Sequence, residues 1–428
     1  MSPARDAALN TLARTALPGW ARAKIPRTFS SVPSDPRDLA LADQLTTGVV
    51  KNLLLLQHLT AHYSNRRLRD IDPLVQRVIT IGLYQLRFLT RIPASAAVDE
   101  AVAQVKRLRL GRASGFVNAV LRNATRDPAP PLPSRDADPR EHARIVLSHP
   151  PDVFDRYVAL VGVDDALRLC ERDNAEPPTI VRLMPGRAAE DLAGPDVAVE
   201  PHEQPGMVVV TGAKVAQFDD WASRGVAQVQ DPTAARVVDF CDVRPGQTVL
   251  DRCAGLGTKT IQLVERVGPH GLVYAIDPAG PRIDRLAQLV ARRVLANVHP
   301  IRAAMLADVG DALPATFDRA LVDVPCGNSG VLPRRPEARY AQDARSLASL
   351  HRLQLDILRD TAPRLTPGGR LVYSTCSVWP AENRLVVDAF LAEHPGFRLA
   401  DEHATLPDLS GDPTRYRDGG YVAVLTGR

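Results

Sequence analysis

The chain has 428 residues, of which 45% are hydrophobic and 24% charged, a length that suits two or three domains, each with its own core. No apolar stretch reaches the length of a membrane span and the N-terminus shows no secretory signal, so we expect a cytoplasmic protein with no membrane partner. The five cysteines include no CxxC pair, which argues against a disulfide framework and a zinc site. We therefore expect a reducing compartment and no metal.

The formal net charge of +4 is unevenly distributed along the chain. Residues 1–126 contain 19 Lys and Arg against 8 Asp and Glu, whereas the remainder contains 34 against 41. A basic segment joined to an acidic one indicates a polyanionic partner, because phosphate contacts require Lys and Arg. A solvated charged face is the alternative, and the size of the imbalance favours nucleic acid.

The first part of the chain is predicted to be entirely helical. Apolar residues recur at spacings of three and four over residues 4–126, which indicates a bundle of five or six helices. Asp72 followed by Pro73 is typical of a helix start. We place the first domain at residues 1–127. Several arginines near its end form a candidate phosphate-binding face: Arg107, Arg109, Arg112, Arg122 and Arg126.

A proline-rich linker and two further domains are expected after the bundle. Residues 127–139 contain five prolines and predict an extended connection. Residues 140–225 read as a small α+β segment, with a helical pattern over 143–160 and two apolar strands. Strands and helices alternate over 226–428, starting with a strand at 226–230 and ending in an antiparallel hairpin. This alternation predicts a doubly wound α/β sheet.

A glycine turn joins an expected strand to a helix within residues 248–260, TVLDRCAGLGTKT. Glycines there let the backbone approach a ligand, and the helix N-terminus offers N–H donors to an anionic group. Asp277 ends the next strand, where a carboxylate can accept hydrogen bonds from ribose hydroxyls. The GxGxxG pattern of nicotinamide sites is absent because position 260 is Thr, which favours S-adenosylmethionine as the cofactor.

Two similar stretches later in the chain each end a strand with a turn that carries a cysteine. They are LVDVPCGNSG at 321–330 and LVYSTCS at 371–377, and a long helix over 344–365 is expected to connect them. Because ligands bind at the carboxyl ends of such strands, neighbouring strands would bring Cys326 and Cys376 to one crevice. A single free cysteine is more often a small buried hydrophobe. The remaining cysteines are expected in the core or lining the glycine turn: Cys170, Cys241 and Cys253.

Two strand-end thiols beside an adenosyl cofactor point to methylation of a pyrimidine carbon. Carbon 5 of cytosine is a weak nucleophile, and a thiolate that adds to carbon 6 activates it, which is covalent catalysis. The scheme needs one nucleophilic cysteine, a polar group near the ring and a proton acceptor. Asp323, three residues before Cys326, is well placed for the ring. The target base must be splayed into the pocket, which single-stranded RNA allows most easily.

Several motifs then resemble one known family. DVPCGNSGVL and VYSTCSVWPAEN are similar to the paired cysteine motifs of the RsmB/Fmu branch of the RNA 5-methylcytosine methyltransferases, within the NOL1/NOP2/Sun family. DPLVQRVITIGLYQLRFL with VNAVLRN resembles the NusB-type helical domain fused to that branch. The resemblance covers nearly the whole chain. It implies a multidomain fold: an all-α NusB-like bundle, a small α+β segment, and an α/β doubly wound class I (Rossmann-like) methyltransferase sheet.

The resemblance also implies roles for individual residues. Cys376 would be the nucleophile at carbon 6, and Cys326 would assist proton removal or product release. Asp277 would hold the ribose of S-adenosylmethionine, while Asp323 would contact both cytosine and cofactor. The implied catalytic set is Cys376, Cys326, Asp323 and Lys259, and the implied cofactor-binding set is Cys253, Ala254, Gly255, Leu256, Gly257, Thr258, Lys259, Asp277, Arg282 and Asp323.

Some positions depart from the family pattern. The family loop CAAPGGKT reads CAGLGTKT here, with Leu256 in place of Pro and Thr258 in place of Gly. Ala304 stands where the family has an Asp near the adenine, and the closing DGFF-type motif reads DGGY at 418–421. These changes affect cofactor binding more than the chemistry, because both cysteines and Asp323 are present.

The leading hypothesis is an S-adenosylmethionine-dependent enzyme that makes 5-methylcytosine in small-subunit (16S) ribosomal RNA. One alternative is an RNA-binding ribosome-assembly factor whose cofactor pocket is impaired. Another is the same chemistry on transfer RNA or DNA. In DNA enzymes of this chemistry the PC-motif cysteine attacks, so Cys376 would be superfluous and its presence favours RNA. The oligomeric state is left open, with a monomer expected.

Overall fold

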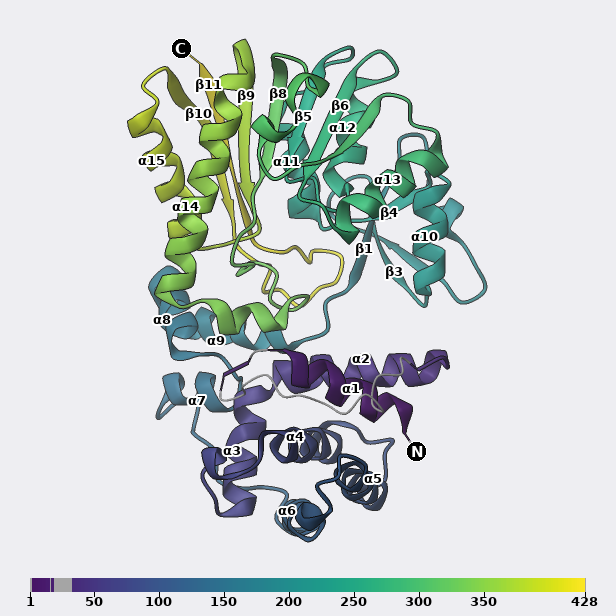
Figure 1. Ribbon diagram of the computed structural model, residues 1–428, viewed down its shortest axis with the longest axis vertical. Coiled ribbons are helices and arrows are strands. Elements are labelled where there is room, and N and C mark those ends of the chain that lie inside the picture. The colour runs from purple at the N-terminus through teal and green to yellow at the C-terminus, as the bar shows by residue number, and fades with distance from the viewer. Residues whose placement is uncertain (1, 16, 19–32, 428) are drawn as a thin grey trace. The chain divides into compact units, whose positions relative to one another are not determined.

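The computed structural model describes residues 2–15, 17–18 and 33–427, and the chain forms two compact units (Figure 1). The first unit consists of Met1–Ala175 together with Arg335–Ala341. The second consists of Glu176–Arg334 and Gln342–Arg428. The division into three domains at residues 1–127, 140–225 and 226–428 stays a prediction.

The first unit is helical, as the spacing of its apolar residues predicts. Its α-helices are α1 (Pro3–Arg14), α2 (Pro36–Lys51), α3 (Leu53–Ser64), α4 (Pro73–Phe88), α5 (Ala94–Arg107), α6 (Ser114–Arg126), α7 (Pro139–Ile145), α8 (Pro151–Val161) and α9 (Val163–Asn174). Asp72 caps α4, because its Oδ1 accepts hydrogen bonds from the backbone N–H groups of Leu74 and Val75 at 2.8 and 3.2 Å. The predicted helix start is therefore confirmed.

Helix α4 forms the centre of the helical core. All of its residues from Val75 to Gln85 are buried, so this helix is enclosed on every side. Glycine at position 82 permits the close approach of α6, since a Cβ there would lie 2.8 Å from the methyl groups of Leu121. Among the described residues, no single helix is long and apolar enough to cross a membrane, although the pair α2 and α3, bent by 81°, passes together on length and composition.

The helix expected over 143–160 is interrupted in the structure. Helix α7 ends at Ile145 and α8 begins at Pro151, because Pro150 and Pro151 start a new helix and Ser148 adopts a left-handed φ of 56°. His149 lies in this break, fully buried, with Nε2 3.2 Å from an Asp173 carboxylate oxygen. Burial lowers the pKa of His149 to about 4, so the ring is neutral at physiological pH.

The second unit contains a small antiparallel sheet. Its strand order is β2-β3-β1-β4, with β1 (Thr179–Leu183), β2 (Ala198–Pro201), β3 (Met207–Thr211) and β4 (Ala227–Val229), accompanied by α10 (Val215–Ser223). The strand expected at 226–230 as the start of the doubly wound sheet was assigned to the wrong sheet. It pairs antiparallel with β1, and Val226 and Ala227 pack in one cluster with Trp221. A short apolar strand carries no signal for which sheet it joins.

The larger sheet of the second unit has seven strands in the order β10-β11-β9-β8-β5-β6-β7, the order in which the labelled strands of Figure 1 follow one another. The strands are β5 (Thr248–Arg252), β6 (Leu272–Asp277), β7 (Val298–Arg302), β8 (Phe317–Asp323), β9 (Leu365–Thr375), β10 (Phe397–Thr405) and β11 (Gly420–Gly427). The first five are parallel, and β10 and β11 form the expected antiparallel hairpin. The predicted doubly wound fold is confirmed.

Helices cover both faces of this sheet. They are α11 (Pro232–Phe240), α12 (Thr258–Val267), α13 (Pro281–Arg293), α14 (Ala344–Thr361) and α15 (Arg384–Glu393). Alternate strand residues point to opposite faces. Thus Val249 of β5 packs in a cluster with α11 and α12, whereas the adjacent Leu250 packs with α14 and α15. Helix α14 ends at Thr361, four residues before the end that the sequence pattern suggested.

The strand order reverses between β5 and β8, because β6 and β7 lie on one side of β5 whereas β8 and β9 lie on the other. In open α/β sheets, ligands bind at the carboxyl ends of the strands around such a reversal. The glycine turn follows β5, and the two cysteine turns follow β8 and β9. The fold therefore brings the predicted cofactor and catalytic segments to one edge of the sheet.

Candidate active site

Strands β8 and β9 are direct neighbours, as the sequence predicted. Asp323 pairs with Ser374 in parallel register, and the backbone N–H of Val324 donates to the Ser374 carbonyl at 3.1 Å. The two following turns consequently meet, with Cys326 Sγ 3.1 Å from Cys376 Sγ. Both cysteines are free and partly exposed.

The two cysteine turns are joined by a second set of hydrogen bonds. The backbone N–H of Gly330 donates to the Cys376 carbonyl at 2.9 Å. Cys376 Sγ lies 3.3 Å from Asn328 Oδ1, while Asn328 Nδ2 donates to the Cys326 carbonyl at 2.9 Å. Asn328 reaches both cysteines because it adopts a left-handed φ of 59°, a conformation that Asn tolerates better than most residues. Asn328 was not predicted as a site residue, although an Asn two residues after a strand-end Cys is a turn signal.

Glu382 is the buried link between the cysteine turns. Its carboxylate accepts hydrogen bonds from the Gly327 N–H at 2.7 Å, from Ser377 Oγ at 2.6 Å and from Gln354 Nε2 at 3.2 Å. Its side chain is completely excluded from solvent. The next residue, Asn383, accepts from Thr375 Oγ1 at 2.6 Å and donates to the Ser377 carbonyl at 2.9 Å. Glu382 and Asn383 thus hold both cysteine turns in place. From the sequence, they were predicted only as part of a motif.

The environment distinguishes the two thiols. The hydrogen bond to Cys376 and burial together raise the pKa of Cys326 well above its usual value. Cys326 therefore stays protonated at neutral pH and can serve as the donor in the contact between the sulfurs. A negative charge on Cys376 would interact favourably with Lys259, whose pKa that charge helps to raise. Lys259 is therefore the cation that would balance a thiolate at Cys376.

Lys259 and Asp323 form an ion pair between the glycine turn and the cysteine turns. Lys259 Nζ lies 2.6 Å from Asp323 Oδ2, and Ser374 Oγ donates to Asp323 Oδ1 at 2.6 Å. Burial lowers the pKa of Lys259, but the attraction to Asp323 more than offsets this. The pKa therefore lies above its ordinary value, and the ammonium stays charged. Both oxygens of Asp323 are held, which fixes the orientation of its carboxylate.

The glycine turn is organised around Asp277. The backbone N–H of Gly255 donates to Asp277 Oδ2 at 3.0 Å, and Arg282 Nη2 donates to Oδ1 at 3.2 Å. A Cβ on Gly255, which has a φ of 58°, would meet nothing nearer than Arg282 Nη1 at 4.0 Å, so the backbone here is open to a ligand. By contrast, a Cβ on Gly257 would lie 2.2 Å from Leu286, so that glycine is required by packing.

The remaining residues of the predicted cofactor set lie in the same turn. Cys253 and Ala254 both donate their N–H groups to the Ile276 carbonyl, which ties the turn to the end of β6. Burial raises the pKa of Cys253 to about 12, so this thiol lines the turn and does not react. Leu256 is 49% exposed, and Thr258 is the first residue of α12. The buried carboxylate of Asp277 and the accessible backbone at Gly255 fit a cofactor that contains a ribose.

Ala304 carries no carboxylate, and its loop is held in another way. Arg252 at the end of β5 is fully buried, and its Nη2 donates to the Ala304 carbonyl. Asp360 accepts from the Leu306 N–H at 3.0 Å and lies 3.5 Å from Arg252. Asp308 is used locally, since its carboxylate accepts from the Met305 N–H at 3.1 Å. The loop after β7 is thus fixed through its backbone.

The arginines predicted to form a phosphate-binding face fall into two groups. Arg107 is half-buried and pairs with Asp6 at 2.7 Å, so it joins α5 to α1 within the helical unit. The other members are exposed on the α5–α6 connection and on α6: Arg109, Arg112, Arg122 and Arg126. Arg66 adds to this surface, because its guanidinium lies 4.8 Å from the ring centre of Phe116 on α6. Among the described residues, no group of three or more His, Cys, Asp or Glu could hold a metal ion.

The fold and the site together define a class I methyltransferase with an added helical domain. Three features are typical of this class: the order of the seven strands, the glycine turn after β5, and the Asp277 carboxylate at the end of β6. Comparisons with known proteins agree. Residues 239–413 match the family described as "16S rRNA methyltransferase RsmB/F", and residues 2–126 match the NusB family.

Individual relatives cover nearly the whole chain. "Ribosomal RNA small subunit methyltransferase B" of Pseudomonas putida is 32% identical over 397 residues, with 90% of this chain and 89% of the relative covered. The protein of the same name from Vibrio cholerae is 32% identical over 410 residues, covering 91% and 90%. The crystal structure of PH0851 has the same fold, with a TM-score of 0.77 at 20% identity over 99% of each chain. The chain therefore belongs to the RsmB/F family of ribosomal RNA small subunit methyltransferases and carries an N-terminal NusB domain.

Proposed function

We propose that this methyltransferase transfers a methyl group from S-adenosylmethionine to carbon 5 of a cytosine in 16S ribosomal RNA, through a Cys376 adduct at carbon 6. The observation that carries the proposal is the sulfur pair, Cys326 and Cys376 at 3.1 Å, beside the fixed carboxylate of Asp323. Two thiols and a carboxylate at the ends of β8 and β9 supply the groups that cytosine methylation needs.

The proposed reaction has two stages. In the first, the Cys376 thiolate forms a bond to carbon 6 of the cytosine, and the electron pair that develops at carbon 5 takes the methyl group. In the second, the proton on carbon 5 is removed, the bond between sulfur and carbon 6 breaks, and the thiolate is regenerated. Cys326, a protonated thiol whose sulfur is 3.1 Å from the leaving sulfur, is assigned to product release: it donates a hydrogen bond to the departing Cys376 thiolate while water takes the proton from carbon 5. The raised pKa of Cys326 argues against it as the nucleophile.

Two charged residues prepare the site for this chemistry. Lys259 balances the negative charges of Asp323 and of the Cys376 thiolate. Asp323, oriented by Lys259 and Ser374, is assigned to the polar edge of the cytosine ring. S-adenosylmethionine supplies an electrophilic methyl group when bound. Asp277, Arg282 and the accessible backbone at Gly255 are assigned to hold it.

The exposed arginines of the NusB domain are assigned to docking of the RNA. On α6 the outward positions Gly115, Ala119, Arg122 and Arg126 are all exposed, and the small residues between the cations leave room for a phosphate backbone. Replacing Arg112 and Arg122 by Gln is expected to weaken RNA binding and to lower the slope of its salt dependence. Arg107→Gln serves as the comparison, because its guanidinium already pairs with Asp6.

The decisive experiment measures labelled methyl transfer from S-adenosylmethionine to unmodified 16S RNA, with the Cys376→Ala variant in parallel. Transfer by the wild type alone supports the cofactor, the substrate and the nucleophile together. Full transfer by Cys376→Ala would refute the nucleophile assignment. The alternative of an assembly factor rests on Ala304 and the altered glycine turn. Calorimetry showing no binding of S-adenosylmethionine to a chain that still binds RNA would favour that alternative.

A further inference from the structure

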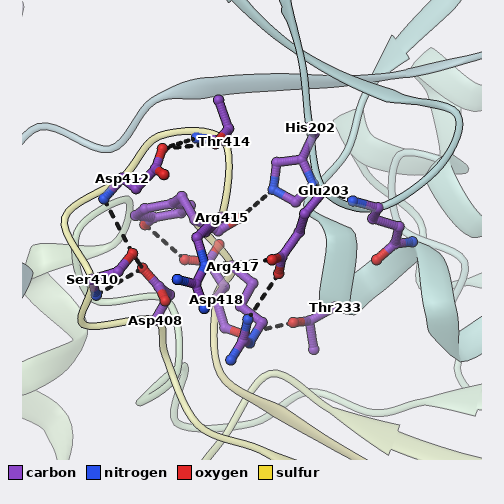
Figure 2. Close-up of polar contacts among 12 residues, drawn as sticks. His202, Glu203, Thr233, Asp408, Ser410, Asp412, Thr414, Arg415, Arg417 and Asp418 are labelled. Carbon is purple, nitrogen blue, oxygen red and sulfur yellow. Dashed lines mark hydrogen bonds and ion pairs between the residues drawn. The ribbon is translucent and has the colours of Figure 1, made fainter.

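The loop between β10 and β11, residues 406–419, lies beside the catalytic turns but takes no part in the chemistry proposed above. We call it the strap. Figure 2 shows a series of local turns in the strap, in which a side-chain oxygen accepts a hydrogen bond from the residue two positions further on. Asp408 accepts from the Ser410 N–H at 3.0 Å, Ser410 Oγ from the Asp412 N–H at 3.2 Å, and Asp412 from the Thr414 N–H at 2.9 Å. Such turns give the strap a defined shape of its own.

One part of the strap is attached to the small antiparallel sheet (Figure 2). The backbone N–H of Glu203 donates to the Thr414 carbonyl at 2.8 Å, and His202 Nε2 donates to the Tyr416 carbonyl at 2.9 Å. Arg417 also pairs with the Glu203 carboxylate at 3.2 Å. The ion pair is exposed and contributes little to stability, whereas the bond from His202 is buried.

The end of the strap is attached to the cysteine turns through backbone atoms. The N–H of Gly419 donates to the Gly330 carbonyl at 2.9 Å, and the N–H of Gly330 donates to the Cys376 carbonyl at 2.9 Å. Through these two bonds, the strap is linked to the Cys326 turn, and the Cys326 turn is linked to the Cys376 turn. A Cβ on Gly330 would lie 2.4 Å from the Gly419 oxygen, and one on Gly420 would lie 2.9 Å from the Thr375 oxygen. The three segments are therefore in direct backbone contact.

An ion pair between the buried Asp418 carboxylate and the partly exposed Arg334 guanidinium locks this contact. Asp418, almost wholly buried, accepts from Arg334 Nε at 3.0 Å and from the Tyr416 hydroxyl at 2.9 Å. Its backbone N–H donates to the carboxylate of Asp231, the N-cap of α11, at 3.1 Å, and its carbonyl accepts from Thr233 Oγ1 at 2.7 Å. Arg334 follows the Cys326 turn by a few residues. The pair thus fastens the Cys326 turn to the strap by side chains as well as by backbone.

We propose that the strap positions the two cysteine turns for methyl transfer, and that Asp418 and Arg334 are positioning residues for the reaction. They act through the Gly419–Gly330 and Gly330–Cys376 backbone bonds, which set the separation of the two sulfurs. The inference rests on the proposed function for its catalytic consequence. Its structural consequence, the distance between Cys326 and Cys376, can be measured without RNA or cofactor.

The test compares Asp418→Asn with wild type and with a control on the same strap, Arg415→Gln. Arg415 pairs with Glu203 at 3.5 Å on the surface. It is therefore on the same strap as Asp418 but outside the bonds that join Asp418 to the Cys326 turn. The first readout is the rate at which diamide, which takes up two hydrogens, converts the Cys326 and Cys376 thiols to a disulfide, followed by mass spectrometry. The second is the turnover rate with saturating RNA and S-adenosylmethionine, alongside the Kd for S-adenosylmethionine.

For Asp418→Asn we expect disulfide formation several-fold slower and turnover about 10- to 100-fold lower, with cofactor Kd within threefold of wild type. Arg415→Gln is expected to match wild type in all three. Arg334→Lys, which keeps the charge, should retain more turnover than Arg334→Gln. If Asp418→Asn fails to fold, Tyr416→Phe, which removes one hydrogen bond to Asp418, is expected to show the same pattern with smaller changes.

The outcomes separate this inference from the proposed function. Wild-type rates of both disulfide formation and turnover in a folded Asp418→Asn would overturn the inference while leaving the proposed function intact. A slower disulfide reaction in Asp418→Asn, with no methyl transfer by the wild type, would support the positioning role and refute the proposed function. Equal losses of cofactor binding and turnover would also overturn the inference, because they would indicate general damage.

Discussion

The site at the carboxyl ends of the strands has two halves that are held differently: the catalytic half is the pair of cysteine turns after β8 and β9, and the cofactor half is the glycine turn after β5 with the end of β6. At the ends of β8 and β9 the cysteine turns are held by a buried carboxylate, Glu382, which accepts hydrogen bonds from Gly327, Ser377 and Gln354. At the end of β5 the buried carboxylate is Asp251, which has one hydrogen bond among the described residues, from Thr260 Oγ1. Both side chains are almost completely excluded from water.

This difference appears in the electrostatics of the cofactor half. Burial raises the pKa of Asp251 to about 7, and the hydrogen bond from Thr260 opposes this without cancelling it. Asp323 raises the pKa of Asp251 further. A buried carboxylate with several donors serves as a fixed joint, whereas one with a single donor is poised to titrate near neutral pH. We therefore expect the cysteine turns to be rigid and the segment at the end of β5 to make stability depend on pH.

The largest effect is expected when the joint of the catalytic half is removed. Glu382→Ala leaves the Gly327 N–H and the Ser377 hydroxyl without their buried acceptor, so the free energy of unfolding should fall by about 4 kcal/mol. Methyl transfer should fall with it, because the turns lose their common anchor. Chemical denaturation monitored by circular dichroism measures the first effect.

Glu382→Gln provides the matched control. Its amide keeps the size of the side chain and one acceptor oxygen, so we expect a loss of about 1–2 kcal/mol. Equal stability of Glu382→Ala and wild type would show that the cysteine turns are held by other contacts, and the contrast between the two halves would lose its basis.

The second prediction concerns the pH dependence of stability that Asp251 introduces. The folded-state pKa of about 7 lies above the ordinary value of 3.8, so between these values the folded chain retains a proton that the unfolded chain has lost. Stability therefore falls as pH rises through this window, by up to about 4 kcal/mol at roughly 1.4 kcal/mol per pKa unit. Asp251→Asn should match wild type near pH 4 and exceed it near pH 8. Parallel curves of unfolding free energy against pH for the two proteins would contradict this assignment.

The sequence predicted the placement of Cys326, Cys376 and Asp277 better than the residues that hold them in place. Cys326 and Cys376 were expected together because each follows a strand, and parallel strands align their carboxyl ends. Asp277 followed from the same rule. These residues are recognisable because each combines a local pattern, an apolar strand and a turn, with a reactive side chain.

The supports depend on contacts between distant parts of the chain. Glu382 reaches Gly327 across 55 residues, and Asp418 reaches Arg334 across 84. No local pattern records such a partner, so the sequence showed neither role. The strand Ala227–Val229 was placed in the wrong sheet for the same reason, because pairing with β1 is set by packing against Trp221 and not by the strand's own residues.

The smallest expected effect tests whether binding of S-adenosylmethionine depends on the Asp277 carboxylate itself or only on the total negative charge of this region. Asp277→Asn keeps the shape of the side chain but weakens the bonds to the Gly255 N–H and to Arg282, so affinity for S-adenosylmethionine should fall about tenfold, equivalent to about 1.4 kcal/mol. Asp284→Asn is the matched control, because its carboxylate pairs on the surface with Arg302 at 2.7 Å and lies on the same helix as Arg282. Calorimetric titration of both variants should show a change in Kd for Asp277→Asn only. Because Asn keeps an oxygen that can accept from the Gly255 N–H, Asp277→Asn should leave the free energy of unfolding within about 1 kcal/mol of wild type, in contrast to Glu382→Ala. A large loss of stability in Asp277→Asn would mean that the turn after β5 is as firmly joined to the fold as the cysteine turns are.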